Sequence, residues 1–183
     1  QCHVKKEADL TIASIYIPVS LASRFGVVGI DQNYKVTSFI EKPDEPAEAP
    51  DKPGFSFVNM GIYVFNAVVL KDVLQNTERE NIPNKDFGKD IIPYMLKQGY
   101  NVQAYRFEDE NKKIEPYWMD IGTIDSYYAA SMDLIQPSPE FNLYDQHWPI
   151  RTRQWQFPPA KTLSHEGERV GRAFNSLITD GTI

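Results

Sequence analysis

Short apolar runs separated by polar turns fill the first part of the chain, and their composition predicts strands. The runs are rich in Val, Ile, Thr and aromatic residues, which are typical of strands. The second and third runs flank the polar segment Asp31–Tyr34, so together they predict a β-hairpin. The predicted strands are residues 10–19, 26–30, 35–40, 58–65 and 101–107.

Segments with helical spacing of apolar residues alternate with these strands. Asp86 is a suitable N-cap before one such segment, and Gly99 can end the same helix. Thr123 can cap another, and Asp125 places an acid in its first turn, where the helix dipole favours negative charge. Strands interleaved with helices indicate an α/β layer architecture. The predicted helices are residues 67–74, 88–97 and 123–134.

Two segments show neither the apolar runs of a strand nor the helical spacing of apolar residues. Residues 43–54 contain four prolines and several acids, which predicts a surface loop. Residues 136–161 are rich in proline and aromatic residues. Trp148 and Trp155 in this segment need a surface to pack on, so we interpret it as an ordered linker and not as a disordered one.

The last segment carries a weak repeat signal. Leu177 and Ile183 are six residues apart, which is the spacing of hexapeptide β-helix repeats.

The chain opens on "QCHVKKEADL" without an initiator Met and closes on an apolar pattern, so we interpret both ends as cuts through a longer protein. We divide the chain into a first domain at 1–135, a linker at 136–161 and the start of a second domain at 162–183.

Composition and charge exclude several classes of protein. The chain has 183 residues, is 42% hydrophobic and carries a net charge of -6, which argues against a general nucleic-acid binder. No apolar run approaches the roughly 20 residues that a membrane-spanning helix needs. Cys2 is the only cysteine, so a reducing cytoplasm is the simplest compartment.

The segment Glu41-Lys42-Pro43 is the first candidate for chemistry, because it stands where a predicted strand ends. The ordinary explanation is a solvated charge pair at a strand end. The functional explanation is that Lys42 projects from the carboxyl end of a strand, where open α/β sheets bind their ligands. A flexible ammonium at that place is suited to a phosphate group.

The segment "YWMDIGTIDSYY" is the second candidate. Asp120 lies between an aromatic pair and a Gly-Thr turn that begins a helix, so it is either a helix-capping residue or a carboxylate available to a hard cation such as Mg2+. A single carboxylate holds Mg2+ weakly. A metal site at Asp120 would therefore assemble only together with substrate phosphates.

Five motifs in order, "RFGVVGID", "FIEKP", "NMGIYVF", "DFGKDIIP" and "YWMDIGTIDSYYAASMDL", resemble the sugar-nucleotidyltransferase superfamily. The linker motif "PEFNLYDQHWPIRT" followed by "PPAK" is similar to that of the bacterial glucose-1-phosphate adenylyltransferases, also called ADP-glucose pyrophosphorylases. The resemblance runs from about Ala8 to Ile183. It implies the carboxyl-side part of a Rossmann-like nucleotidyltransferase domain, followed by a linker and the start of a left-handed β-helix.

The resemblance also implies an activity. Members of the family form ADP-glucose and pyrophosphate from ATP and glucose 1-phosphate with Mg2+, in the cytoplasm, for bacterial glycogen synthesis, and the complete enzyme is a homotetramer. Lys42 matches the lysine that binds the sugar phosphate, and Glu41 matches an acid that hydrogen-bonds the glucose hydroxyls. Gly26 matches a glycine whose backbone lines the sugar site, and Asp120 matches the carboxylate that holds Mg2+.

Two residues depart from the family pattern. Asn59 stands beside the Met-Gly of the sugar site where many relatives have serine, and it can still donate and accept hydrogen bonds to the sugar. Met119 stands where bacterial relatives commonly carry arginine, and a thioether cannot neutralise phosphate charge.

The family's Gly-rich loop, which grips the ATP phosphates, has no counterpart in this sequence, so we expect the piece alone to be inactive. Three hypotheses follow: a piece of a catalytic subunit, a piece of a non-catalytic regulatory subunit of the same family, or a stand-alone module that binds sugar phosphates or supports assembly.

Overall fold

The computed structural model describes residues 1–82, 84–108, 116–147, 149–151, 153, 155–162 and 171–179. It consists of two compact units, Gln1–Phe107 and Glu108–Ile183, and each unit is described by itself below. The division between the units falls before the predicted domain boundary at residue 135. The boundaries at 135 and 161 therefore stay predictions.

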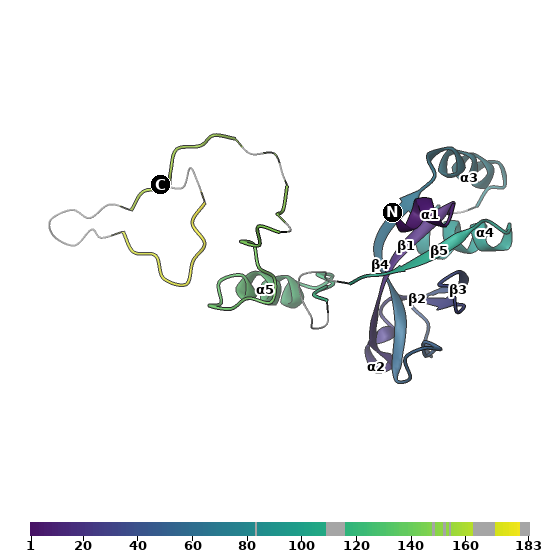
Figure 1. Ribbon diagram of the computed structural model, residues 1–183, viewed down its shortest axis with the longest axis horizontal. Coiled ribbons are helices and arrows are strands. Elements are labelled where there is room, and N and C mark those ends of the chain that lie inside the picture. Colours follow the sequence, from purple (N-terminus) through teal and green to yellow (C-terminus); the bar gives the residue numbers. More distant parts are fainter. Residues whose placement is uncertain are drawn as a thin grey trace. The chain divides into compact units, whose positions relative to one another are not determined.

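The first unit is built on a five-stranded sheet with the order β3-β2-β4-β1-β5 (Figure 1). β1 is antiparallel to β4 and parallel to β5, and β2 is antiparallel to both β3 and β4. This mixed sheet and its helices confirm the predicted α/β class and the β2–β3 hairpin. The strands are β1 (Leu10–Pro18), β2 (Gly26–Ile30), β3 (Val36–Glu41), β4 (Phe55–Phe65) and β5 (Val102–Arg106).

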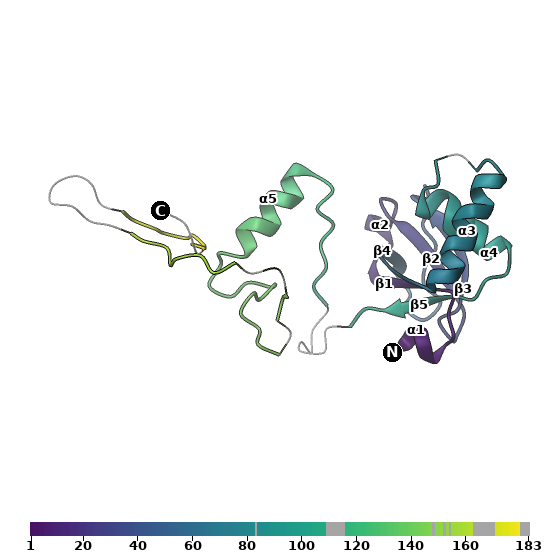
Figure 2. The ribbon, with the colours of Figure 1, turned by 90° about the horizontal axis from the view of Figure 1, so that it is seen from above.

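Helices of the first unit pack on the sheet through apolar side chains. α3 and α4 lie next to each other against the sheet in both ribbon views (Figure 2). Leu10 and Ile12 of β1 are fully buried in one cluster with Val73 of α3 and Met95 of α4. The helical elements of this unit are α1 (Cys2–Lys5), α2 (Val19–Ala22), α3 (Ala67–Arg79), the π-helix η1 (Phe87–Ile91) and α4 (Ile92–Lys97).

Two helices differ from their predicted form. The segment predicted as one helix over 88–97 begins with a π-helical turn, and the α-helix starts at Ile92. Pro93 explains the change, because proline lacks the N–H that an α-helix needs at this position and its ring clashes with the carbonyl four residues before it. α3 continues to Arg79, beyond the predicted end at Leu74. The prediction ended too early because residues 75–79 are polar and carry no apolar period.

The second unit contains α5 (Ile124–Asp133), which begins and ends close to its predicted bounds. Thr123 caps it as predicted: its hydroxyl accepts a hydrogen bond from the Ser126 amide, and the Ser126 side chain accepts one from the Thr123 amide. The Tyr117 and Phe141 rings stack at 5.6 Å. None of the helices in the described residues has the length and apolar character to cross a membrane.

The predicted linker and β-helix are only partly covered by the structure. Trp148 lies outside the described residues, and Trp155 is 60% exposed. The described residues 171–179 form neither helix nor strand, and Ile183, half of the repeat signal, lies outside them. The ordered linker and the start of a left-handed β-helix stay predictions.

Candidate functional site

The carboxylate of Glu41 is the centre of the candidate site. Glu41 is the last residue of β3 and pairs with Gly26 of β2. A Cβ atom at Gly26 would lie 2.8 Å from Glu41 Oε2, and one at Gly88 of η1 would lie 2.7 Å from the same oxygen. Because both positions are glycine, the carboxylate can lie between the hairpin and the π-helical turn, where its side chain is only 20% exposed.

Lys42 follows β3 directly, as the sequence predicts for a residue at the carboxyl end of a strand. Its backbone N–H donates to the Phe25 carbonyl at 3.1 Å, and its φ of +51° lies in the left-handed region. Such a conformation is costly for a residue with a side chain and tends to occur at functional positions. The Lys42 Nζ lies 3.8 Å from Glu41 Oε1, and the side chain is 63% exposed. The Lys42 ammonium therefore lies on the solvent-exposed side of the Glu41 carboxylate.

A bulge in β4 brings together the polar side chains of Asn59 and Tyr63. Ile12 of β1 pairs with Tyr63 and Ser14 pairs with Asn59, so three residues of β4 lie opposite the single residue Ala13. Gly61 within the bulge has a φ of +74°, a conformation that glycine adopts without strain. The Asn59 side chain closes the bulge by accepting a hydrogen bond from the Gly61 amide at 2.9 Å. Bulges of this kind redirect the side chains that follow them.

Tyr63 is a member of the site that the sequence analysis missed. Its hydroxyl accepts a hydrogen bond from Asn59 Nδ2 at 2.7 Å. Burial raises the pKa of the Tyr63 phenol, the Asn59 hydrogen bond opposes that rise, and the negative charges of Glu41 and Asp86 add to it. Tyr63 stacks on Phe87, and the neighbouring Gly88 faces the Glu41 carboxylate, so the phenol belongs to the same cluster as Glu41.

Phe87 and Asp86 complete the cluster. The Phe87 ring stacks on Tyr63 at 5.6 Å between centroids. Asp86 caps η1, as predicted, by accepting a hydrogen bond from the Lys89 amide at 2.8 Å. A Cβ atom at Gly88 would also lie 3.4 Å from Asp86 Oδ1. The Glu41 cluster, as we call it, consists of Gly26, Glu41, Lys42, Asn59, Tyr63, Asp86, Phe87 and Gly88.

The Glu41 cluster offers two kinds of chemistry side by side. Carboxylate, amide and phenol groups beside aromatic rings are suited to a ligand with many hydroxyl groups. The Lys42 ammonium adds a positive charge suited to phosphate. The structure thus brings together four residues predicted from the sequence: Gly26, Glu41, Lys42 and Asn59. Asn59 belongs to the cluster through its hydrogen bond to Tyr63.

Asp120 belongs to the second unit. It is exposed, and its Oδ2 lies 3.1 Å from the position that a Cβ atom at Gly122 would take. The capping hydrogen bonds of α5 are made by Thr123 and Ser126, so the described structure does not need Asp120 as the cap. Across the described residues, no three His, Cys, Asp or Glu side chains form a group that could hold a metal ion.

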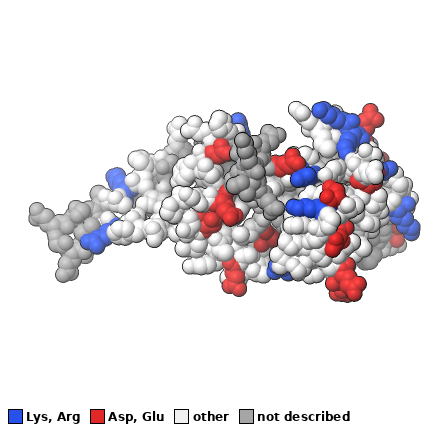
Figure 3. Space-filling view, turned by 60° about the horizontal axis from the view of Figure 1, so that its bottom comes forward, with Lys and Arg blue, Asp and Glu red and all other residues white. Residues whose placement is uncertain are grey.

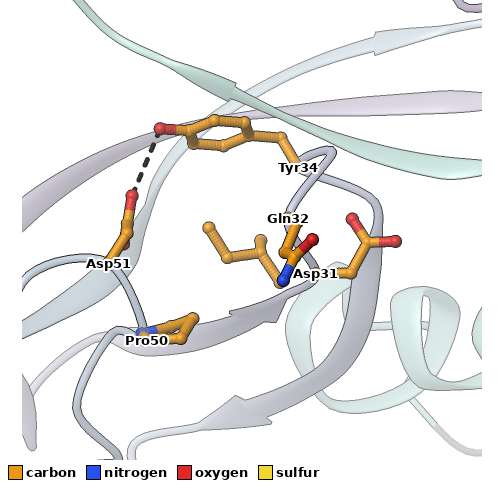
Figure 4. A pocket seen from close by; sticks show the side chains of 6 residues that line it. Asp31, Gln32, Tyr34, Pro50 and Asp51 are labelled. Carbon is orange, nitrogen blue, oxygen red and sulfur yellow. Dashed lines mark hydrogen bonds between the residues drawn. The ribbon is translucent and has the colours of Figure 1, made fainter.

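A pocket of about 330 Å³ lies at the opposite end of the hairpin from Glu41, at the β2–β3 turn. Tyr16 and Tyr34 both donate hydrogen bonds to Asp51 Oδ2, and Figure 4 shows the Tyr34 hydroxyl directed at this carboxylate. Burial raises the pKa of the Tyr16 phenol, and the hydrogen bond to Asp51 raises it further. These contacts fasten the proline-rich loop to β1 and to the hairpin.

Charged side chains of both signs are interspersed on the face shown in Figure 3. Positive charges stand beside negative ones there and do not join into a continuous basic surface. This face therefore gives no reason to prefer a long polyanion over a small phosphorylated ligand.

Comparison with known proteins defines the class. The nucleotidyl transferase family model matches residues 1–137, which is more than half of the 183 residues, so the chain belongs to the nucleotidyl transferase family. Among curated proteins, it is 46% identical to the glucose-1-phosphate adenylyltransferase of Methylobacillus flagellatus. It is 44% identical to those of Nitrosomonas europaea and Thermus thermophilus.

These matches cover 99% of this chain but only 42–45% of the length of each relative. The chain thus spans less than half the length of the curated relatives that it matches.

Proposed function

We propose that this chain is the carboxyl-side part of the catalytic region of an enzyme that forms ADP-glucose and pyrophosphate from ATP and glucose 1-phosphate. The observation that carries the proposal is the Glu41 carboxylate seated against Gly26 and Gly88, with the Lys42 ammonium 3.8 Å away. This pair offers one group for sugar hydroxyls and one for a sugar phosphate. The similarity to glucose-1-phosphate adenylyltransferases supports the same assignment.

In this proposal each residue of the Glu41 cluster acts on the sugar phosphate. Glu41 accepts hydrogen bonds from glucose hydroxyls, Tyr63 and Phe87 flank the ring, and Lys42 holds the phosphate. A phosphate oxygen of the sugar attacks the α-phosphorus of ATP in line. A new P–O bond forms as the bond between the α- and β-phosphates breaks, and pyrophosphate leaves with the bridging oxygen. Such a transfer depends on positioning and charge neutralisation more than on covalent help from the protein.

Asp120 fits a role in holding Mg2+ against the phosphates. It presents an exposed carboxylate, and carboxylate oxygens together with substrate phosphates are the ligands that Mg2+ prefers. The metal, when bound, would neutralise phosphate charge during the transfer.

We further propose that the complete enzyme acts in the cytoplasm as a homotetramer in glycogen synthesis.

A non-catalytic regulatory subunit of the same family is the second candidate, and Met119 is the observation that favours it. Its side chain is 39% exposed and stands directly before Asp120. A thioether supplies no positive charge to the phosphates. A subunit that has lost catalysis would tolerate such a residue.

The test is to measure pyrophosphate release by the full-length protein that contains this sequence, with each nucleoside triphosphate paired with each sugar 1-phosphate. We expect ATP with glucose 1-phosphate and Mg2+ to be the preferred combination. Full-length protein that binds glucose 1-phosphate without releasing pyrophosphate would favour the regulatory subunit. Protein that prefers another sugar phosphate or nucleotide would refute the proposed substrates.

A further inference from the structure

The orientation of the Asn59 side-chain amide is fixed by its surroundings. The Gly61 backbone N–H can only donate, so the atom of Asn59 that faces it at 2.9 Å is the oxygen Oδ1. The NH2 group must then be the part that faces the Tyr63 hydroxyl at 2.7 Å. An asparagine at this place therefore has one possible direction of hydrogen bonding toward Tyr63.

This direction determines what the Tyr63 hydroxyl can do. A phenol oxygen that accepts from an NH2 group keeps its own proton for another acceptor. No described residue accepts that proton through a hydrogen bond. The side chain is held in place by stacking on Phe87. Tyr63 is therefore an oriented hydrogen-bond donor within the Glu41 cluster.

The electrostatics of the cluster agree with this direction. Glu41 and Asp86 place negative charge near the phenol and favour its protonated, neutral form. Both carboxylates can only accept hydrogen bonds when ionised. A ligand hydroxyl in this cluster thus finds acceptors in Glu41 and Asp86, and its own oxygen needs a donor.

We infer that Asn59 is a positioning residue that holds the Tyr63 hydroxyl as the hydrogen-bond donor to an oxygen of the bound sugar. The inference rests on the proposed function for the identity of the ligand, a sugar 1-phosphate. Asn59 acts through Tyr63, because its oxygen accepts from the Gly61 amide and its NH2 group donates to the Tyr63 hydroxyl. This differs from the sequence prediction, in which Asn59 contacts the sugar itself.

Asn59→Asp tests the inference because it reverses one hydrogen bond and preserves the other. The new carboxylate can still accept from the Gly61 amide, so the bulge stays closed. It can only accept from Tyr63, so the phenol proton turns away from the ligand. Asn66→Asp is the matched control: Asn66 follows the same strand, is exposed, and caps α3 through the same type of side-chain oxygen.

The first readout needs neither substrate nor activity. The full-length protein that contains this sequence is labelled with 13Cζ-tyrosine, and the Tyr63 signal, assigned with Tyr63→Phe, is followed against pH. We expect Asn59→Asp to raise the pKa of Tyr63, because a donated hydrogen bond is replaced by a negative charge. Asn66→Asp should leave the pKa of Tyr63 at its wild-type position.

The second readout is the dissociation constant of glucose 1-phosphate, measured by isothermal titration calorimetry for every variant, because Tyr63→Phe lacks the Tyr63 signal. Loss of a neutral hydrogen bond weakens binding about three- to tenfold. We expect that loss in Asn59→Asp and in Tyr63→Phe, with no further loss when the two are combined. Asn59→Ser, whose hydroxyl can donate to Tyr63, should recover part of it.

Two outcomes would overturn the inference. If Asn59→Asp leaves the pKa of Tyr63 unchanged, Asn59 merely closes the bulge. If the pKa rises but the dissociation constant stays at the wild-type value, the phenol does not donate to the sugar. Neither readout requires turnover, so a protein that binds glucose 1-phosphate but forms no ADP-glucose would refute the catalytic proposal and leave this inference standing.

Discussion

The carboxylate of Glu41 occupies the space that a side chain at Gly88 would need, since a Cβ atom at Gly88 would lie 2.7 Å from Glu41 Oε2. The two residues come from different elements, the end of β3 and the π-helical turn η1. The position of the carboxylate thus depends on the absence of a side chain in a neighbouring turn.

Gly88→Ala should weaken binding of glucose 1-phosphate without unfolding the protein. The clash is with the end of a flexible side chain, so Glu41 can move aside, and the loss of a charge-assisted hydrogen bond corresponds to about a tenfold rise in KM. Steady-state kinetics on the full-length protein measures the effect. In a Glu41→Ala background the same substitution should have no further effect. An additional loss in that background would show that Gly88 acts independently of Glu41.

Gly26→Ala should instead lower the stability of the fold. A Cβ atom there would lie 2.6 Å from the Phe39 ring, which is buried in the core and cannot move aside cheaply. Overpacking of this kind typically costs about 1–3 kcal/mol. Urea unfolding followed by circular dichroism measures the loss. Unchanged stability would mean that the hairpin adjusts to the added methyl group.

Asp120→Asn should reduce kcat by orders of magnitude and leave the fold intact, because it removes charge with almost no change in shape and the cap of α5 is made by Thr123 and Ser126. The dependence of rate on Mg2+ concentration should shift to higher concentrations. Asp125→Asn, in the first turn of the same helix, is the matched control and should keep wild-type kinetics. Wild-type activity in the Asp120 variant would refute the metal-holding role.

Alkaline pH should lower the stability of the first unit through Tyr16. Its folded-state pKa is raised above the ordinary value of 10.0, first by burial and then by Asp51, so the folded protein retains a proton that the unfolded chain loses. The free energy of unfolding is therefore unaffected below about pH 10 and falls as pH rises above it. In denaturant titrations above about pH 10, the free energy of unfolding of Tyr16→Phe should fall less steeply with pH than that of the wild type.

The exposed Tyr105→Phe is the control for this measurement and should follow the wild-type curve. An equal slope in wild type and Tyr16→Phe would show that the Tyr16–Asp51 hydrogen bond does not control the alkaline transition.

Local patterns were enough to predict most elements of the first unit. Strand β1 and the β2–β3 hairpin follow from apolar runs around polar turns, and the cap Asp86 follows from local hydrogen bonding, as does the cap Thr123 in the second unit. The π-helical start of the helix at 88–97 was not predicted. Proline inside a helical period signals a break but does not specify which hydrogen-bonding pattern replaces it.

The site could be predicted only in part, because its members are far apart along the chain. Glu41 and Lys42 adjoin a strand end and were found there. Tyr63 and Phe87 lie in an alternating strand and a helix start, where aromatic residues are ordinary core residues. The bulge at Gly61 brings Tyr63 within hydrogen-bond distance of Asn59, and a glycine inside the strand pattern was the one sequence signal of it.

The most direct test of the account is the effect of Lys42→Gln on the full-length enzyme, with each substrate varied in turn. The ammonium should contact the sugar phosphate in both the ground state and the transition state, so its loss should raise KM for glucose 1-phosphate and change kcat much less. A lost charge-assisted hydrogen bond is worth about 1.5–3 kcal/mol, or at least roughly tenfold in KM. Lys42→Arg should recover only part, because a planar guanidinium does not replace a point charge. An unchanged KM for glucose 1-phosphate, or a rise in KM for ATP instead, would contradict the placement of the sugar phosphate at the Glu41 cluster.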